Sequence, residues 1–436
     1  MKSLKNRPII LGTLILTFSG FLTRGIGFLF RILSSRILGA EKMGLYQLSA
    51  PVLALSYSLC AGGFHTAVSK TVAERTAKED SHPIHILLAS VLLALPLSLL
   101  VSAGIFVSAS FLATTIILEP ALAPYMKILA WSIPLSSLHA CTNGYFYGIK
   151  KSQIPAVSQI MEQTGRIGFI CIGYFLLHKD FLNLMFYGIM FGEGFALLFN
   201  LFFINPPLFS PSVLHGKRGD FKSILKIAVP TGANRLSLNL MQSFEAIVLP
   251  NSLRLFGYSR ENALSIYGTL TGMALPFLLF PNALTMSLST ILLPEISKKQ
   301  ASNETAYLKQ TIRKSILFSL FLGMTFSFLF VIGGQTIGEV SFHNPLAGKC
   351  IAILALSCPF LYINTTLSGI LQGMGKIVSM YLVNLLSLGS RIAFVIFLVP
   401  KFGLQAYFAG LYLSQALQSL LYLRLLYLRL LYLPVH

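Results

Sequence analysis

Three arginines lie inside stretches of the chain that are otherwise apolar, and they are the residues best suited to chemistry. Arg24 and Arg31 interrupt a long apolar run near the start, and Arg235 lies in a later run with Asn239 and Gln242. An arginine at the centre of a bilayer costs roughly 2.5–3.5 kcal/mol on insertion scales, so each one needs a partner or a function. A guanidinium is planar and always charged, and its paired donors match phosphate oxygens. The pattern therefore predicts a site for a phosphate-bearing anion.

The first apolar run, residues 9–38, is long enough to cross a bilayer as a helix. At about 100° per residue its polar and small side chains fall in one narrow stripe, while Leu, Ile and Phe fill the rest of the helix. The stripe contains Thr13, Thr17, Gly20, Arg24, Arg31 and Ser35. One face of this helix should therefore meet lipid or packed protein, and the other should meet something wet or anionic.

Composition places these runs in a polytopic membrane protein. The chain has 436 residues, of which 55% are hydrophobic and 11% charged, and its mean hydropathy is +0.74. Soluble domains carry about 25% charged residues. We therefore predict an all-α fold of about twelve transmembrane helices. The predicted spans are 9–38, 45–67, 85–110, 122–147, 155–177, 181–204, 223–250, 263–293, 311–333, 349–371, 377–399 and 404–433.

Basic residues are distributed unequally between alternate loops. Of 33 Lys and Arg, twenty fall in segments that share a side with the N-terminus, six fall in the opposite loops, and seven lie in or beside the spans. The positive-inside rule then places both termini in the cytoplasm. The net charge of +19 is explained mainly by this topology, so no nucleic-acid partner is expected.

No pattern indicates an enzyme, a metal site or a cofactor. The five cysteines occur singly in apolar runs, which favours small buried side chains over disulfides or metal ligands. His65, His139 and His343 lie on separate segments, with no catalytic partner near them in the sequence.

The chain contains an internal repeat at an offset of 225 residues. Residues 128–169 and 353–394 share 11 identities over 42 positions without a gap, among them Pro134 with Pro359 and Arg166 with Arg391. An offset that spans six helices gives both halves the same orientation, as in transporters that place their substrate site between two repeats. We predict two six-helix lobes around a central cavity, residues 1–204 and 223–436, joined by a cytoplasmic linker at 205–222.

The seventh predicted span resembles the first in character. Arg235, Asn239 and Gln242 share a face at i, i+4 and i+7, with Glu245 somewhat off it, and Asn282 lies on a polar face of the eighth span. If the first helix of each lobe lines the interface, the arginines converge on one chamber with these amides beside them. The alternative is that each arginine pairs with a buried carboxylate or caps helix carbonyls, and Glu245 is such a partner for Arg235.

Other embedded charges have simpler explanations. Glu162 stands four residues before Arg166, which predicts a structural ion pair within one helix. Arg391 has Ser387 at the corresponding place, and we assign it a structural role as well. Glu193, like Glu245, is an intramembrane carboxylate and hence a candidate for binding a coupling proton or cation; a hydrogen-bonded packing role is the alternative.

Several short motifs, most of them in the first 80 residues, match a known pattern. They are Gly12-Thr-Leu-Ile-Leu-Thr, Thr23-Arg24, Gly27-Phe28, Arg31-Ile32, Arg36-Ile37-Leu38-Gly39-Ala40-Glu41, Met43-Gly44-Leu45-Tyr46-Gln47, Ala67-Val68-Ser69-Lys70, Val229-Pro230 and Leu249-Pro250. With these motifs the chain resembles the stage V sporulation protein B and polysaccharide-biosynthesis group. That group belongs to the superfamily that also contains lipid II flippases, O-antigen flippases and multidrug extrusion (MATE) antiporters. The resemblance implies two six-helix lobes around a cavity, with essential arginines on the first span at positions that match Arg24 and Arg31.

Our hypothesis is a cell-membrane flippase or exporter of a lipid-linked anionic saccharide, serving cell-wall or spore-cortex synthesis in a sporulating bacterium. Membrane lipids and cell-wall synthesis proteins are the expected partners; the sequence does not indicate an oligomeric state. Two alternatives remain open. A MATE-type cation antiporter would need a carboxylate in its first or seventh span, and a non-transporting scaffold for wall synthesis would not need a wet stripe.

Overall fold

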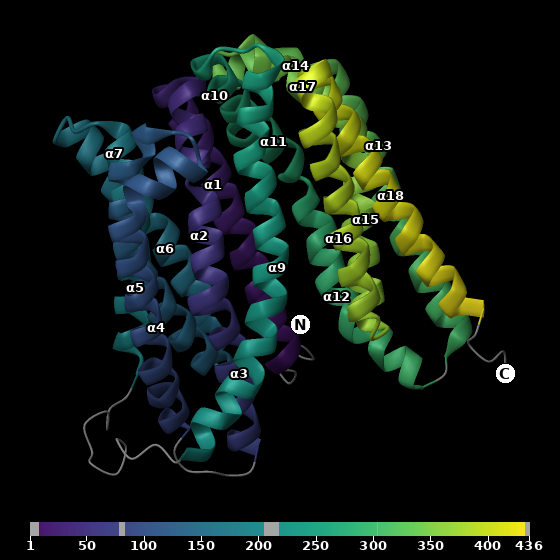
Figure 1. The fold of residues 1–436 in the computed structure, drawn as a ribbon. Helices are drawn as coiled ribbons and strands as arrows, with labels where there is room; N and C mark the ends of the chain where they lie inside the picture. Colours follow the sequence, from purple (N-terminus) through teal and green to yellow (C-terminus); the bar gives the residue numbers. More distant parts are fainter. Residues whose placement is uncertain (1–7, 78–82, 205–217, 303, 432–436) are drawn as a thin grey trace. The chain divides into compact units, whose positions relative to one another are not determined.

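The computed structural model describes residues 8–77, 83–204, 218–302 and 304–431; for 8–17, 218, 219 and 429–431 it describes the backbone alone. Most of the predicted linker therefore lies outside the described residues, as do the side chains of Thr13 and Thr17. The described residues are almost entirely helical and contain no strand (Figure 1).

Each of the twelve predicted spans coincides with one or more helices, several of them interrupted by π or 3-10 turns. In the first half these are α1 (Pro8–Gln47), α2 (Ala50–Tyr57), η1 (Ser58–Gly62), α3 (Gly63–Ala77), α4 (Ile84–Phe111), η2 (Leu112–Ile116), η3 (Pro120–Leu122), α5 (Ala123–Gly148), α6 (Gln153–Cys171), η4 (Ile172–Leu176) and α7 (Phe181–Phe202). In the second half they are α9 (Arg218–Phe256), α10 (Arg260–Gly268), η5 (Thr269–Ala274), α11 (Leu275–Leu279), α12 (Asn282–Ala301), α13 (Thr305–Phe342), α14 (Pro345–Leu354), η6 (Ala355–Ser357), α15 (Cys358–Gly373), α16 (Ile377–Ala393), η7 (Phe394–Leu398), α17 (Val399–Phe402) and α18 (Leu404–Leu431).

Within the described residues, seven helical segments are long and apolar enough to cross a membrane. The others include α1, α5, α6 and α9, which carry Arg24, Arg31, His139, Glu162, Arg166 and Arg235. The predicted all-α polytopic fold is confirmed; the count of twelve crossings and their orientation stay predictions.

The chain divides into two compact units. Unit 1 contains residues 1–30 and 45–247, and unit 2 contains residues 31–44 and 248–436. Both α1 and α9 therefore contribute to both units. The lobes predicted from the repeat, 1–204 and 223–436, have different limits and stay a prediction.

Small residues set the closest helix contacts within each unit, and the repeat is visible in them. A Cβ on Gly144 of α5 would lie 2.6 Å from the carbonyl oxygen of His65 on α3. Its repeat mate Gly369 on α15 lies closer still to α12, where a Cβ would be 1.9 Å from the Ser289 hydroxyl. In a membrane, where lipid is as apolar as leucine, close contact between backbones is a main source of helix association. The α3–α5 contact of unit 1 thus has its counterpart in the α12–α15 contact of unit 2.

One internal break positions the residues that follow the arginine stripe. Gly39 has φ 72° and ψ 177°, so α1 is two helical pieces on either side of it. A side chain at this position would be strained, because L-residues avoid positive φ. Beyond the break, Gly44 lies directly against the backbone of Leu264, which anchors this piece within unit 2.

Candidate functional site

The two arginines of the stripe on α1 differ in exposure. Arg24 is exposed and, among the described residues, makes no hydrogen bond or ion pair. Gly27, one turn further, lies so close to α6 that an added Cβ would be 2.9 Å from the Gln163 amide nitrogen. Arg31 is half-buried and belongs to unit 2, where its Nη1 donates to the Thr271 carbonyl at 3.5 Å. Arg24 is thus the freer of the two guanidinium groups.

The hydroxyls of Ser35 in the stripe and of Thr23 beside it have local partners. The buried hydroxyl of Ser35 donates to the Ile32 carbonyl at 2.9 Å. Thr23, beside Arg24, donates to the Ser19 carbonyl at 2.8 Å. These hydroxyls follow the usual i−3 and i−4 pattern of helical Ser and Thr, so they need no ligand.

The predicted face of α9 packs on η1 within unit 1. Arg235 is exposed, and its side chain crosses Gly62: an added Cβ there would lie 3.0 Å from Nη1. Asn239 donates to the Ser58 hydroxyl and, at 3.3 Å, to the Ala54 carbonyl. Arg235 makes no hydrogen bond or ion pair with any described residue. Its charged end is therefore available to a ligand, whereas the Asn239 amide is partly engaged.

The remaining predicted ligands differ in exposure. Gln242 is exposed. Asn282 belongs to unit 2 and is buried, with its Oδ1 accepting from the Thr285 hydroxyl. Glu245 is buried at 7% relative exposure. The structure brings Arg235 and Asn239 together on one helix face; a single chamber shared with Arg24, Arg31 and Asn282 stays a prediction.

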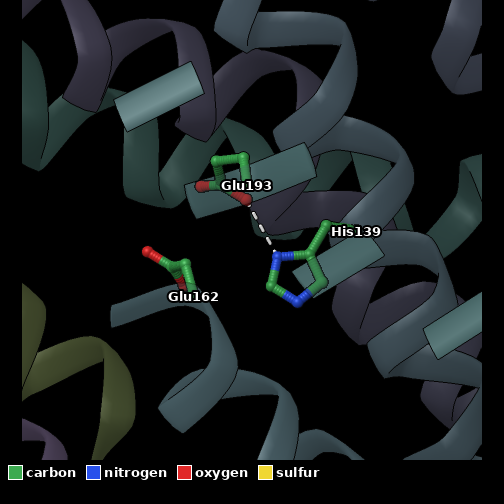
Figure 2. Close-up of side chains that lie close together, drawn as sticks. All are labelled: His139, Glu162 and Glu193. Atoms are coloured by element: carbon green, nitrogen blue, oxygen red, sulfur yellow. Dashed lines mark hydrogen bonds and ion pairs between the residues drawn. The ribbon is translucent and has the colours of Figure 1, made fainter. Parts of the chain in front are cut away.

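A second cluster lies inside unit 1, where α5, α6 and α7 pack together (Figures 1 and 2). His139 of α5 is buried, and its Nδ1 is 2.9 Å from Oε2 of Glu193 on α7. The Glu162 carboxylate of α6 lies beside them, so that one ligand atom from each residue falls within 4.8 Å of the others. On its other side Glu162 accepts from Arg166 Nη2 at 2.6 Å.

The predicted ion pair between Glu162 and Arg166 is confirmed. Arg166 also lies against α7, where an added Cβ on Gly192 would be 3.1 Å from its Cβ and 3.3 Å from its Nε. The pair therefore lies within α6 and packs against α7 at Gly192, while the buried Nε of Arg166 has no hydrogen-bond partner among the described residues. Arg391 is half-buried in α16, and its structural role stays a prediction.

Buried amides and hydroxyls surround the cluster. His139 Nε2 is 2.9 Å from the Ser158 hydroxyl and 3.0 Å from the Asn143 side-chain nitrogen. Asn200 donates to Asn143 Oδ1 at 2.8 Å and to the Thr142 hydroxyl at 2.9 Å. Through these hydrogen bonds, one imidazole contacts side chains from all three helices.

Sequence reasoning named Glu162 and Glu193 but missed His139. Its partners come from other helices, so nothing near it in the sequence reveals them. A signal existed in the helix itself: His139, Thr142 and Asn143 occupy i, i+3 and i+4 of an otherwise apolar span. Three polar residues on one face of a membrane helix indicate a buried polar contact.

An all-helical fold with apolar spans and ionisable groups held inside them defines a multi-pass membrane protein. The polysaccharide biosynthesis protein family model matches residues 9–300, and the MatE family model matches residues 241–397. The chain belongs to the polysaccharide biosynthesis protein family, as its N-terminal motifs predicted.

Similar proteins are found both among characterised sequences and among solved structures. Stage V sporulation protein B of Bacillus subtilis (strain 168) is 28% identical over 385 residues, which is 83% of this chain and 72% of that protein. Lipid II flippase MurJ of the same organism is 22% identical over 411 residues, covering 84% and 73%. The inward-facing conformation of a multidrug resistance MATE family transporter of the MOP superfamily superposes with a TM-score of 0.75 at 15% identity, covering 94% of each chain. The structural likeness establishes the fold.

Proposed function

We propose that this protein is a flippase or exporter of a lipid-linked oligosaccharide or peptidoglycan precursor. It would act in the cell membrane of a sporulating bacterium during cell-wall or spore-cortex synthesis, with both termini in the cytoplasm and in contact with cell-wall synthesis proteins. Its role is transport, and no chemical step is assigned to it. The diphosphate head of the carried lipid would rest on Arg24, Arg31 and Arg235, and the lipid tail would stay in the bilayer.

The observation that carries this proposal is the state of Arg24 and Arg235. Both lie within helices of a membrane protein, both are exposed, and neither pairs with a described residue. A guanidinium retained in such a place without a partner suits an anionic ligand. The family description and the names of the two relatives supply the class of anion.

Amide side chains would complete the binding surface. Gln242 is exposed one turn beyond Asn239 on the face of Arg235, where its amide can hydrogen-bond a sugar. Asn282 is buried, so it would contribute to binding by fixing the position of α12 and not by contacting the sugar. Glu193 and Glu245 are the candidates for coupling transport to a proton or cation.

A MATE-type cation antiporter is the second candidate, and one observation favours it. Unit 1 contains a buried histidine beside two half-buried carboxylates, and an intramembrane carboxylate suits exchange of cations. The MatE family model also matches part of the chain. The two functions differ in the charge of the cargo, because a cation would be repelled by Arg24 and Arg235.

The test uses purified protein in liposomes with a fluorescent polyprenyl-diphosphate sugar, and measures binding and movement between leaflets. A desolvated guanidinium–phosphate contact is worth roughly 1.5–3 kcal/mol, so Arg24→Ala should weaken binding about tenfold to a hundredfold. Arg24→Lys keeps the positive charge but loses the paired guanidinium donors, so its affinity should fall between that of the wild type and that of Arg24→Ala. Arg254→Ala, an exposed arginine predicted in an outer loop, is the control and should bind normally.

Full activity of Arg24→Ala at normal expression would refute the anion site. Transport of organic cations, insensitive to Arg24→Ala and blocked by Glu193→Gln, would support the antiporter in its place.

A further inference from the structure

The His139–Glu193 contact of unit 1 has a counterpart in unit 2 that carries no ionisable group. Asn364 lies 225 residues after His139 and donates to Gln415 Oε1 at 3.0 Å. The π turns η4 and η7 end the helices α6 and α16, and α7 and α18 are the long helices that follow them. Gln415 on α18 therefore makes the contact in unit 2 that Glu193 on α7 makes in unit 1. The same helix contact is thus made by a neutral amide pair in one unit and by a titratable pair in the other.

This asymmetry shows that packing does not require charge at the contact. Asn364 is as buried as His139, at 5% relative exposure each, and its bond joins α15 to α18 as the histidine joins α5 to α7. Burying ionisable groups is more costly than burying amides, because the charged form loses its hydration. The titratable pair in unit 1 therefore needs a reason other than stability.

The charges of the cluster do not balance while the histidine is neutral. With both carboxylates ionised, Glu162 and Glu193 contribute two negative charges, and Arg166 contributes one positive charge. One negative charge is left over, and a partly desolvated site favours a compensating positive charge. A single proton on the imidazole gives two neutral ion pairs, Glu162 with Arg166 and Glu193 with His139.

The hydrogen bonds around Nε2 satisfy the imidazole with or without that proton. Asn200 donates to Asn143 Oδ1, which turns the Asn143 amide nitrogen toward Nε2 as a donor to the neutral ring. On the other side lies the Ser158 hydroxyl, which donates to the Ala196 carbonyl at 3.3 Å and so presents a lone pair to Nε2. A protonated Nε2 can donate to this oxygen. Nε2 thus lies between one donor and one acceptor, an arrangement suited to a group that changes protonation state.

We propose that His139 and Glu193 form a proton-binding site within unit 1. A proton from water adds to Nε2 and is held by Ser158, while Nδ1–H stays bonded to the Glu193 carboxylate. Release reverses these steps, and Asn143 then donates to Nε2. Ser158 and Asn143 position the proton, and Arg166 forms the ion pair with Glu162.

A metal ion fits the same residues poorly. The Nδ1–Oε2 distance of 2.9 Å is that of a hydrogen bond, and Nδ1 would have to lose the proton that makes this bond before it could bind an ion. A divalent cation would also turn the net charge of the cluster from one negative to one positive beside the Arg166 guanidinium. A proton balances the charge without moving a side chain.

Neighbouring helices connect this site to the arginine of α9. His65 on α3 lies within electrostatic range of both His139 and Arg235, and Tyr57 on α2 lies within range of Glu162, Glu193 and Arg235. The helix α4, also packed on α5, brings only His85 in its first turn. Resting on the proposed function, an anion on Arg235 would offset its positive charge and favour protonation. By linkage the proton would favour the anion to the same degree.

The site can be tested without any substrate. Full-length protein with ¹⁵N-histidine in nanodiscs is titrated by NMR, and the resonances lost in His139→Asn assign His139 among the eight histidines. The His139 signals should titrate in the wild type. Ser158→Ala removes the acceptor of the charged form and should weaken proton affinity about tenfold; Glu193→Gln should weaken it by about tenfold or more. Replacing His178, an exposed histidine, by Asn is the control and should leave the His139 titration unchanged.

Three results would overturn the proposal: a His139 that stays neutral at every pH at which the protein is folded, a titration unmoved by Ser158→Ala and Glu193→Gln, or signals that respond to sodium rather than to pH. His139→Asn with Glu193→Gln, which copies the neutral pair of unit 2, should stay folded in thermal melts.

Coupling is a separate measurement. Binding of the lipid-diphosphate probe to wild type should strengthen about fivefold or more on acidification, and this dependence should vanish in the double variant. If Arg24→Ala and Arg235→Ala bind the probe normally while His139 still titrates, the proposed function fails and the proton site stands. If His139 does not titrate while the arginine variants lose binding, the proton site fails and the proposed function stands.

Discussion

Replacement of Arg166 by alanine should destabilise unit 1 by about 2–3 kcal/mol. The guanidinium is 2.6 Å from Glu162, and the two side chains are 22% and 25% exposed. Breaking a fully buried ion pair costs about 3–5 kcal/mol, whereas an exposed pair contributes about 0–1 kcal/mol. A pair exposed by about a quarter falls between these limits. Arg166→Ala also leaves two carboxylates facing a single histidine, which adds repulsion between Glu162 and Glu193.

A double-mutant cycle separates this effect from lost packing against Gly192. Free energies of unfolding are measured in nanodiscs for Arg166→Ala, Glu162→Gln and the combined variant. The combined variant should recover most of the loss, because it leaves no unpaired carboxylate beside Glu193. Arg391→Ala is the matched control in unit 2: Ser387 occupies the place of the acid there, so the loss should be smaller. Equal losses for the two arginines, or no recovery in the combined variant, would refute the reasoning.

Three further outcomes are expected. Gly268→Ala should cost about 1–3 kcal/mol by overpacking, because its Cβ would lie 2.0 Å from an α1 carbonyl; Gly104→Ala, with open space around it, should be neutral or slightly stabilising in the same unfolding assay. The hydrogen bond from Lys299 lowers the pKa of Glu304 at the start of α13. At neutral pH the ionised Glu304 therefore gives the wild type a small stabilisation that Glu304→Gln lacks. In the wild type this stabilisation is lost as pH falls through the lowered pKa, so thermal melts of the two proteins should converge in acid. Reporter fusions after Lys299 should be cytoplasmic and those after Asn344 external, and one reversed result would overturn the twelve-span topology.

The fold could be predicted from the sequence because each membrane helix can be recognised from its own stretch of residues. A membrane helix must satisfy its own backbone, so an apolar run of sufficient length specifies it without help from its neighbours. The stripe of Arg24 and Arg31 also rests on spacing along one helix, and its role stays a prediction. The ion pair of Glu162 with Arg166, four residues apart, also follows from one helix alone.

Contacts between helices could not be predicted in this way. His139 meets Glu193 54 residues away in sequence, and Asn239 meets Ser58 across 181 residues. No periodicity within either helix selects the partner. Gly27 illustrates the same difficulty, because its closeness to Gln163 on α6 depends on how α1 lies within unit 1.

The repeat supplies what single-helix reasoning lacks. Once Gly144 and Gly369 are seen to make equivalent close contacts, each residue of unit 1 has a reference position in unit 2 that faces the same packing demands. A difference in charge between such positions then has to be explained by something other than packing. His139 with Asn364 and Glu193 with Gln415 are differences of this kind, and both lie at one contact. Ionisable groups on both sides of a single buried contact favour a titrating site over a packing accident, since the carboxylate alone would be an embedded charge without its partner.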